Sequence, residues 1–529
     1  MMKLEEEIRG MLDDGNMEPL EVLELIDDIH RLGLGYRFRH DTKRALHRIL
    51  ASSDKVPDKF RKSVHASALY FKLLRQHGYE VPTDIFDCFK DQNSKLTTKD
   101  VQGMLSLYEA SHVAFDGENT LDEGRESTNF HLKKMLGEVD KETGMRVRHA
   151  LELPLYHKMQ RVEARWNIEM YDKQNEANHV LHTLAILDFN MVQSQYQQEL
   201  LQLSRWWAEI GLANKLSFAR NRLMECFFWA IEMVFEPQHS KGRTELTKLA
   251  MLITVLDDVY DVYGSLEELE HFTDAVERWD INAVNYLPHY MKLAFLALYN
   301  TINNIAYNTL KEQDCVIIPT STSEAKWKSE KYIPKFDEYM SYGCISSSGA
   351  VLLLHAYILT TQNRAEAVEY LMQYQGLVQL SADIFRLAND LGSSKADIEI
   401  GKTANAISCY MHETGETEEV ARAYVRNLIH KNWKMLNKAV VHDSIFDNFF
   451  PEIAITLAQT ALCQYQHGDA HSSPDDHSRN KMLSVISLRA FTLKTVHQGT
   501  TMMAHHRFLI SSTLLLKVLD IPEPSYLRG

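Results

Sequence analysis

The segment LITVLDDVYDVYG, residues 252–264, joins an apolar run to a cluster of three aspartates. Asp257 and Asp261 are four residues apart, so on a helix they project from the same face. The apolar residues before Asp257 predict that this helix is buried on most sides. Burying like charges so close together is costly unless a cation compensates them, whereas a solvated helix end before Gly264 would carry no such cost. The segment therefore indicates either a cation site or an exposed, charged helix end.

A second oxygen-rich pattern lies in FRLANDLGSSKADIEIG, residues 385–401. Asn389, Ser393 and Asp397 follow one another at intervals of four, which stacks three oxygen ligands along one helical face. Alone, this pattern is equally consistent with a helix end. Together with the aspartates it indicates a hard cation, because Mg²⁺ binds a few protein oxygens together with substrate phosphate.

Arginines and aromatic residues accompany both patterns. Arg220 and Arg222 are expected on one helix over residues 217–233, and Arg386 shares the face of Asn389. Surface ion pairs are the ordinary alternative for arginines, as core packing is for Trp229, two turns beyond Arg222. Near a cationic intermediate, an aromatic face would also be stabilising. The residues thus predict a helical cavity with metal at its mouth, suited to removing diphosphate from an organic substrate.

The composition favours a helical, water-soluble chain of two domains. Its 529 residues include only 22 Gly and 12 Pro, and period-2 strand patterns are absent. The net charge of −15 argues against nucleic acid as a partner, and no apolar run is long enough for a membrane span. The 6 cysteines show no metal-binding spacing. One helix is expected to begin at Pro19 and to end at Gly33 and Gly35, and further helices are expected at residues 181–195, 217–233 and 246–261, with an irregular region at 317–335.

Eight segments, in order along the chain, resemble the plant terpene synthases, particularly the monoterpene-forming branch. They are LLRQHGYEV (73–81), MLSLYEASH (104–112), LELPLYHKMQRVEARW (151–166), SRWWAEIGL (204–212), SFARNRLMECFFW (217–229), DDVYDVYGSLEELEHFTDAVERWD (257–280), FRLANDLGSS (385–394) and YQHGDAH (465–471). The resemblance covers about residues 11–486. It implies an all-α fold: an N-terminal relic α-barrel domain at 1–172, truncated at its start, then a class I helical bundle with the active site at 173–486. An atypical tail would follow at 487–529.

The resemblance also implies roles for individual residues. The metal ligands would be Asp257, Asp261, Asn389, Ser393 and Asp397, with Asp258 as a further catalytic residue of the aspartate-rich motif. The substrate diphosphate would be bound by Arg220, Arg222 and Arg386, together with Asp257, Asp261 and Asn389. Trp229 and Tyr465 would act at the cavity wall and entrance, with His471 near the entrance loop. The implied cofactor is Mg²⁺, three ions per site, with Mn²⁺ as a substitute.

The chain departs from the family pattern at several positions. Asp397 stands where the family usually has Glu, Asn221 replaces an acid between the two arginines, and Lys402 replaces an acid after Gly401. The stretch at 318–324 is shorter than in the family, the tandem-arginine segment is missing from the start, and residues beyond 486 match no known pattern. An altered gene structure would explain these differences.

The expected function is a monoterpene synthase that ionises geranyl diphosphate with Mg²⁺. The alternatives are a sesquiterpene synthase acting on farnesyl diphosphate and a catalytically impaired family member. Chain-elongating prenyltransferases fit less well, because their second motif would also be D-D-x-x-D. The partners expected are a prenyl diphosphate, no nucleic acid, no membrane, and a monomer or weak homodimer. The resemblance implies the plastid stroma, with the cytoplasm as the alternative because the chain starts without a transit-peptide pattern.

Overall fold

A computed structural model describes residues 1–51, 60–91, 96, 98, 100–173, 177–310, 332–346, 348–361, 375–399, 404–443, 449–487 and 491. Within these ranges the regular structure is helical, and the one strand-like feature is an isolated bridge between Lys90 and Leu96. The predicted all-α fold is confirmed.

The chain divides into two compact units. One comprises Met1–Asn190 and Lys431–Pro451, and the other comprises Met191–His430 and Glu452–Gly529. Two long helices, α9 (His179–Ile210) and α21 (Glu418–Asp443), run through residues of both. Apart from residues 487 and 491, the tail predicted at 487–529 lies outside the described residues.

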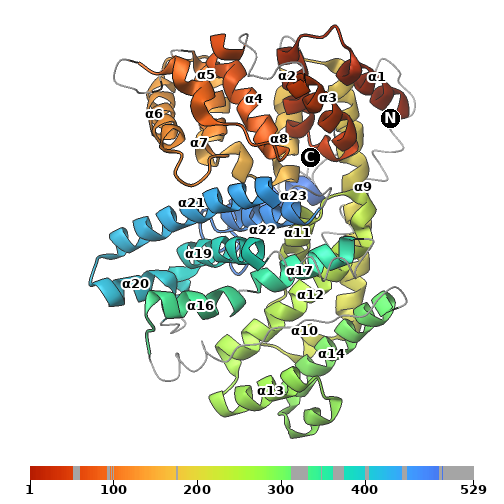
Figure 1. Ribbon diagram of the computed structural model, residues 1–529. Helices are drawn as coiled ribbons and strands as arrows, with labels where there is room; N and C mark the ends of the chain where they lie inside the picture. Colours follow the sequence, from red (N-terminus) through yellow and green to blue (C-terminus); the bar gives the residue numbers. More distant parts are fainter. Residues whose placement is uncertain are drawn as a thin grey trace. The chain divides into compact units, whose positions relative to one another are not determined.

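Eight helices precede α9 in the N-terminal unit (Figure 1). They are α1 (Met2–Asp13), α2 (Pro19–Arg31), α3 (Arg39–Ala51), α4 (Val64–Gln76), α5 (Val101–Ser111), α6 (Asn119–Met135), α7 (Lys141–Glu152) and α8 (Gln160–Tyr171). In α2, Pro19 begins the first turn and Glu18 and Glu21 form a capping box. After α2, Gly33 has φ +73°, and a Cβ there would lie 2.7 Å from the Ala164 Cβ. A glycine is therefore required where the chain turns against α8.

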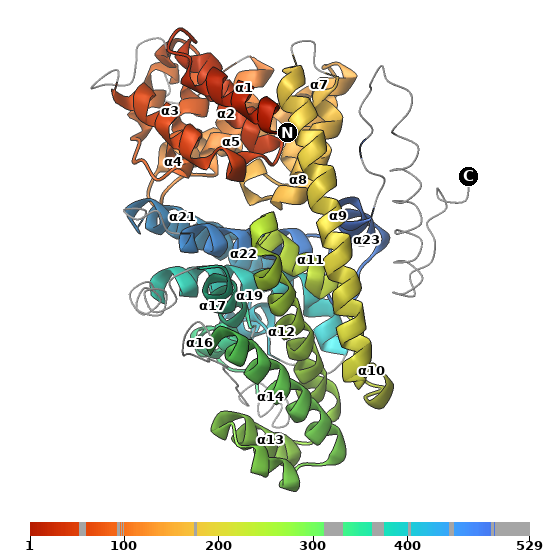
Figure 2. The same ribbon diagram turned by 90° about the vertical axis from the view of Figure 1, so that its right-hand side faces the viewer.

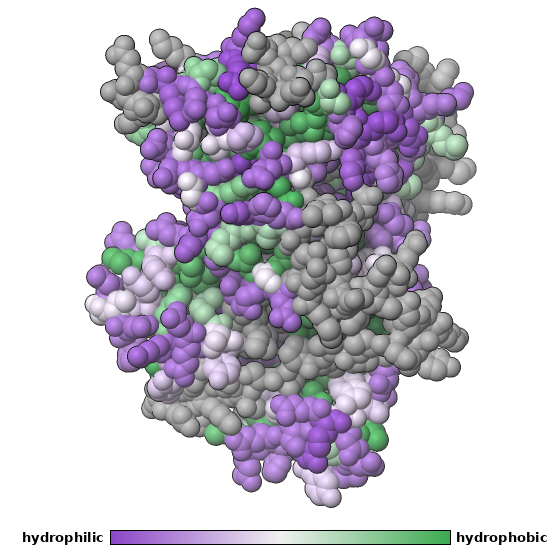
Figure 3. Space-filling model, viewed as in Figure 1, coloured by the Kyte–Doolittle hydropathy of each residue, from purple (hydrophilic) through white to green (hydrophobic). Residues whose placement is uncertain are grey.

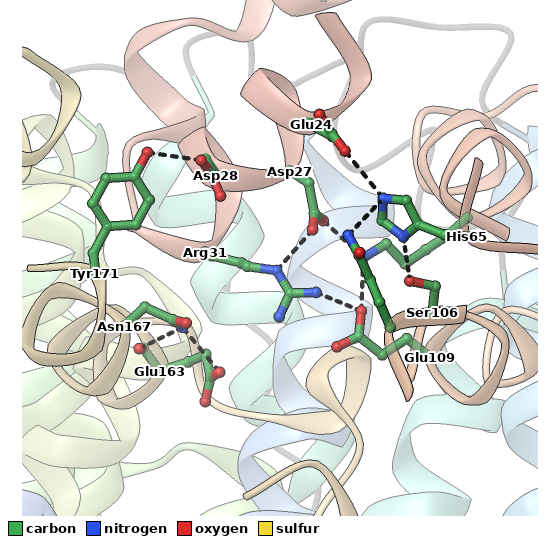
Figure 4. Close-up of polar contacts among 12 residues, drawn as sticks. Glu24, Asp27, Asp28, Arg31, His65, Ser106, Glu109, Glu163, Asn167 and Tyr171 are labelled. Carbon is green, nitrogen blue, oxygen red and sulfur yellow. Dashed lines mark hydrogen bonds and ion pairs between the residues drawn. The ribbon is translucent and has the colours of Figure 1, made fainter. Parts of the chain in front are cut away.

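A charged network lies inside the N-terminal unit (Figure 4). Arg31 of α2 donates to Asp27 at 2.7 Å and to Glu109 of α5 at 2.5 Å. Lys72 of α4 lies 2.7 Å from Asp27 and 2.9 Å from Glu109, and its side chain is only 3% exposed. Two carboxylates and two cations thus compensate one another, which a buried charge requires.

The second unit contains the end of α9, a long helix in Figure 2, and the helices that follow it. These are α10 (Leu212–Lys215), α11 (Leu223–Met233), α12 (Ser240–Asp258), α13 (Leu266–Arg278), α14 (His289–Leu310), α16 (Phe336–Ser346), α17 (Gly349–Thr360), α19 (Gln375–Glu399), α20 (Ala406–Thr414), the first half of α21, most of α22 (Phe450–Gln464) and α23 (Asp476–Ile486). Helix α12 packs against α11, α14 and α17, and α19 packs against α16, α17 and α20. Both helices that carry the oxygen-rich motifs therefore belong to the same packed bundle.

Three helix predictions need correction. The helix expected at residues 217–233 begins only at Leu223, because residues 217–219 form a turn and residues 220–222 are irregular. The helix expected at 181–195 is the much longer α9. The helix expected at 246–261 starts earlier, at Ser240, and continues past Asp258 as a π-helix, Val259–Tyr263. Of the irregular region at 317–335, residues 332–335 are non-helical and the rest lies outside the described residues.

The described surface is largely polar on the face shown in Figure 3. None of the helices in the described ranges is long and apolar enough to cross a membrane.

Candidate active site

The three aspartates at the end of α12 have different environments. Asp257 is exposed, Asp258 is buried and Asp261 is half-buried. Burial raises the pKa of Asp258, hydrogen bonds from Arg220 oppose this rise, and the charge of Asp261 adds to it. Asp261 lies in the π-helix, which closes with a Gly264 N–H to Val259 carbonyl bond of 2.8 Å. Single π-helical turns within α-helices are frequently found at functional sites. The exposed carboxylate of Asp257 is therefore the one accessible to a ligand from solvent.

Arg220 and Arg222 lie in the non-helical residues before α11, with Arg222 as its N-cap, so the prediction that they share a helix is wrong. The structure nevertheless brings them together, because both contact Ser472. Arg220 donates from Nη1 to the Ser472 hydroxyl at 2.7 Å, and Arg222 donates from Nη2 to the Ser472 carbonyl at 2.5 Å. Arg220 also donates from its backbone N and its Nε to Asp258, each at 2.7 Å. Two cations are thus fixed beside the aspartate-rich helix.

The second oxygen-rich motif lies on α19, as predicted. Arg386 is buried, and its Nε donates to the Gly343 carbonyl at 2.6 Å. Its Nη1 lies 3.4 Å from the Asn389 Oδ1, so Arg386 and Asn389 do share one face. Ser393 is buried one turn further on. The side chain of Asp397 lies outside the described residues.

Asp390, which flanks this motif, has a structural role. Its Oδ2 accepts bonds from the Tyr339 hydroxyl and the Ala406 backbone N–H, both at 2.8 Å. The side chain is 1% exposed. Asp390 therefore holds α16 and the start of α20 against α19, and these bonds fix the rotation of α19 that presents Asn389.

Three aromatic side chains meet beside the two motifs. Trp229 of α11 lies 5.1 Å from Phe385 and 6.1 Å from Tyr465, between ring centroids, and Phe385 lies 6.2 Å from Tyr465. Trp229 and Tyr465 were predicted as site residues. Phe385 was not, although its position directly before Arg386 is a usable signal. All three rings are buried, so together they form an apolar, aromatic wall.

Tyr465 interacts with both oxygen-rich motifs. Its pKa lies well above the ordinary value because the phenol is buried; the charges of Asp469 and Asp257 raise the pKa further, and a side-chain hydrogen bond with Asn389 opposes them. A Cβ on Gly392 would lie 3.0 Å from the Tyr465 Cβ, so a glycine is needed where α19 approaches this tyrosine. Helix α19 thus packs closely against the segment that follows α22.

The segment after α22 completes the site. His471 Nε2 lies 3.2 Å from the Thr254 hydroxyl. Burial lowers the pKa of His471 to about 4; the charge of Asp469 raises this pKa, and the charges of Arg220 and Arg222 lower it further. The imidazole is therefore neutral at pH 7. Asp469 and Ser472 were not predicted as site residues; the only signal in the sequence was that Asp469 lies within the YQHGDAH segment and Ser472 directly follows it.

The donor set suits a hard divalent cation. Asp257, Asp261, Asn389 and Ser393 supply carboxylate, amide and hydroxyl oxygens, with no sulfur ligand among them. Arginines lie beside both groups of oxygens, Arg220 at Asp258 and Arg386 at Asn389. The residues therefore fit a metal–diphosphate ligand.

Comparisons with known proteins agree with this geometry. Residues 1–151 match the family described as "Terpene synthase, N-terminal domain", and residues 208–435 match "Terpene synthase family, metal binding domain". An isoprene synthase of Populus tremuloides is 49% identical over 503 residues, which cover 92% of this chain and 84% of that protein. A tricyclene synthase of Medicago truncatula is 46% identical over 502 residues, covering 92% and 86%. Both relatives are named as chloroplastic.

A solved structure shares the fold. The crystal structure of isoprene synthase from grey poplar, Populus x canescens, contains three Mg²⁺ ions and dimethylallyl-S-thiolodiphosphate. It matches with a TM-score of 0.87 and 49% sequence identity, covering 93% of this chain and 96% of that one. The chain therefore belongs to the plant terpene synthase family, as a carbon–oxygen lyase of the isoprene or monoterpene type.

Proposed function

We propose that this enzyme ionises geranyl diphosphate and releases a monoterpene and inorganic diphosphate, with Mg²⁺ as cofactor. The observation that carries the proposal is that one segment, residues 465–472, contacts both helices that carry the oxygen-rich motifs: His471 Nε2 lies 3.2 Å from the Thr254 hydroxyl of α12, and Tyr465 packs against Gly392 of α19. It brings the two oxygen-rich motifs together beside two fixed arginines and an aromatic wall. The ten-carbon substrate is supported by the resemblance to the monoterpene-forming branch and by the identity to tricyclene synthase.

The metal would be held by oxygen ligands from both helices, namely Asp257, Asp261, Asn389, Ser393 and Asp397, with Mn²⁺ as a substitute. When bound, Mg²⁺ supplies Lewis-acid neutralisation of the diphosphate, and the poplar structure supports three ions per site. Arg220, Arg222 and Arg386 provide fixed positive charge where negative charge develops on the leaving group.

The aromatic wall acts on the other product of ionisation, the allylic cation. The faces of Trp229, Phe385 and Tyr465 carry negative charge density, which stabilises a nearby cation. Their burial also excludes water, which would otherwise quench the cation early. The enzyme's own residues thus separate the two charges, with arginines on one side and aromatic rings on the other.

A second candidate is an isoprene synthase acting on the five-carbon dimethylallyl diphosphate. It is favoured by the isoprene synthase relatives at 49% identity and by the bound dimethylallyl analogue in the poplar structure. The named chloroplastic location of the relatives supports a plastid location for this enzyme as well.

The test is a comparison of three substrates. Purified enzyme with Mg²⁺ is incubated separately with dimethylallyl, geranyl and farnesyl diphosphate, and volatile products are identified by gas chromatography. The highest kcat/KM with geranyl diphosphate is expected. The highest value with dimethylallyl diphosphate would establish the second candidate, and the highest with farnesyl diphosphate would make it a sesquiterpene synthase. A folded protein that converts none of them would be the impaired family member.

A further inference from the structure

Ser472 lies between the two arginines that precede α11. Its hydroxyl accepts a 2.7 Å bond from Arg220 Nη1, and its carbonyl accepts a 2.5 Å bond from Arg222 Nη2. One residue thus contacts both guanidinium groups, through two different atoms. The relative position of the two cations therefore depends on where Ser472 lies.

Ser472 is itself held in place by the segment that contains it. Asp469 Oδ1 accepts the backbone N–H groups of both His471 and Ser472, each at 2.9 Å. The Ala470 N–H returns to the Gln464 carbonyl at the end of α22, at 3.2 Å. These bonds turn the chain tightly and fix Ser472 relative to α22.

The contacts leave donors of both arginines available to an anion. Arg220 uses Nε for Asp258 and Nη1 for Ser472, and its Nη2 has no bonding partner in the described part of the chain. Arg222 uses Nη2 for Ser472, its Nη1 lies 3.8 Å from the Glu225 carboxylate, and its buried Nε has no hydrogen-bond partner among the described residues. The arginines are thus oriented without being saturated.

Ser472 is uncharged, so it does not compete with an anionic ligand for the two arginines. A carboxylate at this position would pair with the arginines and compete with a diphosphate for their charge. A hydroxyl and a carbonyl oxygen accept hydrogen bonds from a guanidinium and leave its charge uncompensated. Ser472 can therefore orient both cations without adding to the negative charge already beside them, Asp258 at Arg220 and Glu225 at Arg222.

We propose that Ser472 is a positioning residue for diphosphate, acting through Arg220 and Arg222. The inference rests on the proposed function, in which these arginines bind the leaving group. Without the Ser472 hydroxyl, Arg220 keeps its bonds to Asp258 but loses the hydrogen bond that fixes the position of Nη1.

The test compares Ser472→Ala with Ser473→Ala, the same change at the exposed neighbouring residue. Binding of inorganic diphosphate with Mg²⁺ is measured by titration calorimetry, and kcat and KM are measured with the preferred substrate. Ser472→Ala should weaken diphosphate binding about tenfold, the effect of losing one hydrogen bond to a charged group, and should raise KM. Ser473→Ala should match the wild type, and so should Ser472→Thr, which restores the hydroxyl.

Equal diphosphate binding by wild type and Ser472→Ala would overturn the inference, and so would an equal loss in Ser473→Ala. If Ser472→Ala does not fold, Ser472→Val and Ser472→Thr provide a pair of equal shape that differs in the hydroxyl; equal binding by these two would overturn the inference. A wild type that does not bind diphosphate would also overturn it. A wild type that binds diphosphate through Ser472 but converts no prenyl diphosphate would contradict the proposed function and leave the role of Ser472 standing.

Discussion

Arg220 binds Asp258 twice, from its backbone N to Oδ2 and from its Nε to Oδ1, both at 2.7 Å. The middle aspartate of the acidic motif is therefore an arginine partner, while Asp257 beside it is exposed. Two neighbouring carboxylates of the motif thus have different roles: Asp258 orients Arg220, and Asp257 faces solvent, where a metal ion can bind it.

Asp257→Asn and Asp258→Asn should therefore have different effects. Asp257→Asn removes an exposed carboxylate and should raise the Mg²⁺ concentration needed for half-maximal rate. Asp258→Asn removes the charge that fixes Arg220 and should lower kcat/KM by about tenfold or more, because a charged hydrogen bond is lost, with a smaller change in Mg²⁺ requirement. Metal titrations of both variants measure this. Identical titration curves would contradict the division of roles.

Arg386→Lys keeps the charge but replaces a planar fork with a point charge. The bond from Nε to the Gly343 carbonyl and the approach to Asn389 depend on that fork. We expect weaker binding of inorganic diphosphate with a melting temperature close to that of the wild type. Titration calorimetry measures the affinity for diphosphate, and thermal unfolding measures the melting temperature. Wild-type binding affinity in Arg386→Lys would show that charge alone suffices at this position.

The sequence predicted the helical character of the chain and the shared face on α19, for a clear physical reason. Apolar and polar residues repeat with the helical period, so the shared face of Arg386 and Asn389 follows from spacing alone. The ends of helices were harder to predict. The start of α11 at Leu223 and the π-helix after Asp258 depend on tertiary contacts of Arg220 and Asp258, which no local pattern records.

Contacts between segments far apart along the chain also could not be predicted from the sequence. Ser472 lies far from Arg220 along the chain, and neither its type nor its neighbours distinguish it from Ser473. Phe385 was given no role in the site, because an aromatic residue on a helix is usually buried whether or not it lines a site. The resemblance to a family supplied the predicted roles of Tyr465 and His471, which spacing alone would not have given.

The buried network in the N-terminal unit gives a stability prediction (Figure 4). Lys72→Met removes a cation that contacts both Asp27 and Glu109 and leaves Arg31 to compensate two carboxylates. We expect a loss of about 3 kcal/mol in the free energy of unfolding of this unit. Lys62→Met, at an exposed lysine, is the matched control. Unfolding followed by circular dichroism compares them, and equal melting temperatures would show that the network is not stabilising.

Asp28 is expected to make the stability of the fold depend on pH. Burial raises its pKa from 3.8 to about 6, and the hydrogen bond from Tyr171 opposes that rise. The folded state then binds a proton more tightly than the unfolded state, so this group lowers stability as pH rises from about 4 to above 6. Asp28→Asn lacks this loss and should exceed the wild type in stability above pH 6, by up to about 3 kcal/mol, but not below pH 4. Thermal unfolding across this range tests the sign, and a difference independent of pH would contradict it.

The central claim is that the residues gathered around Tyr465 remove diphosphate from an allylic substrate with the help of Mg²⁺. The most direct measurement is the release of inorganic diphosphate from geranyl diphosphate by the wild type and by Asp257→Ala, with Mg²⁺ and with the metal chelated. We predict release by the wild type that stops on chelation, and none by a folded Asp257→Ala. Release that persists without metal, or at the wild-type rate in Asp257→Ala, would contradict the account.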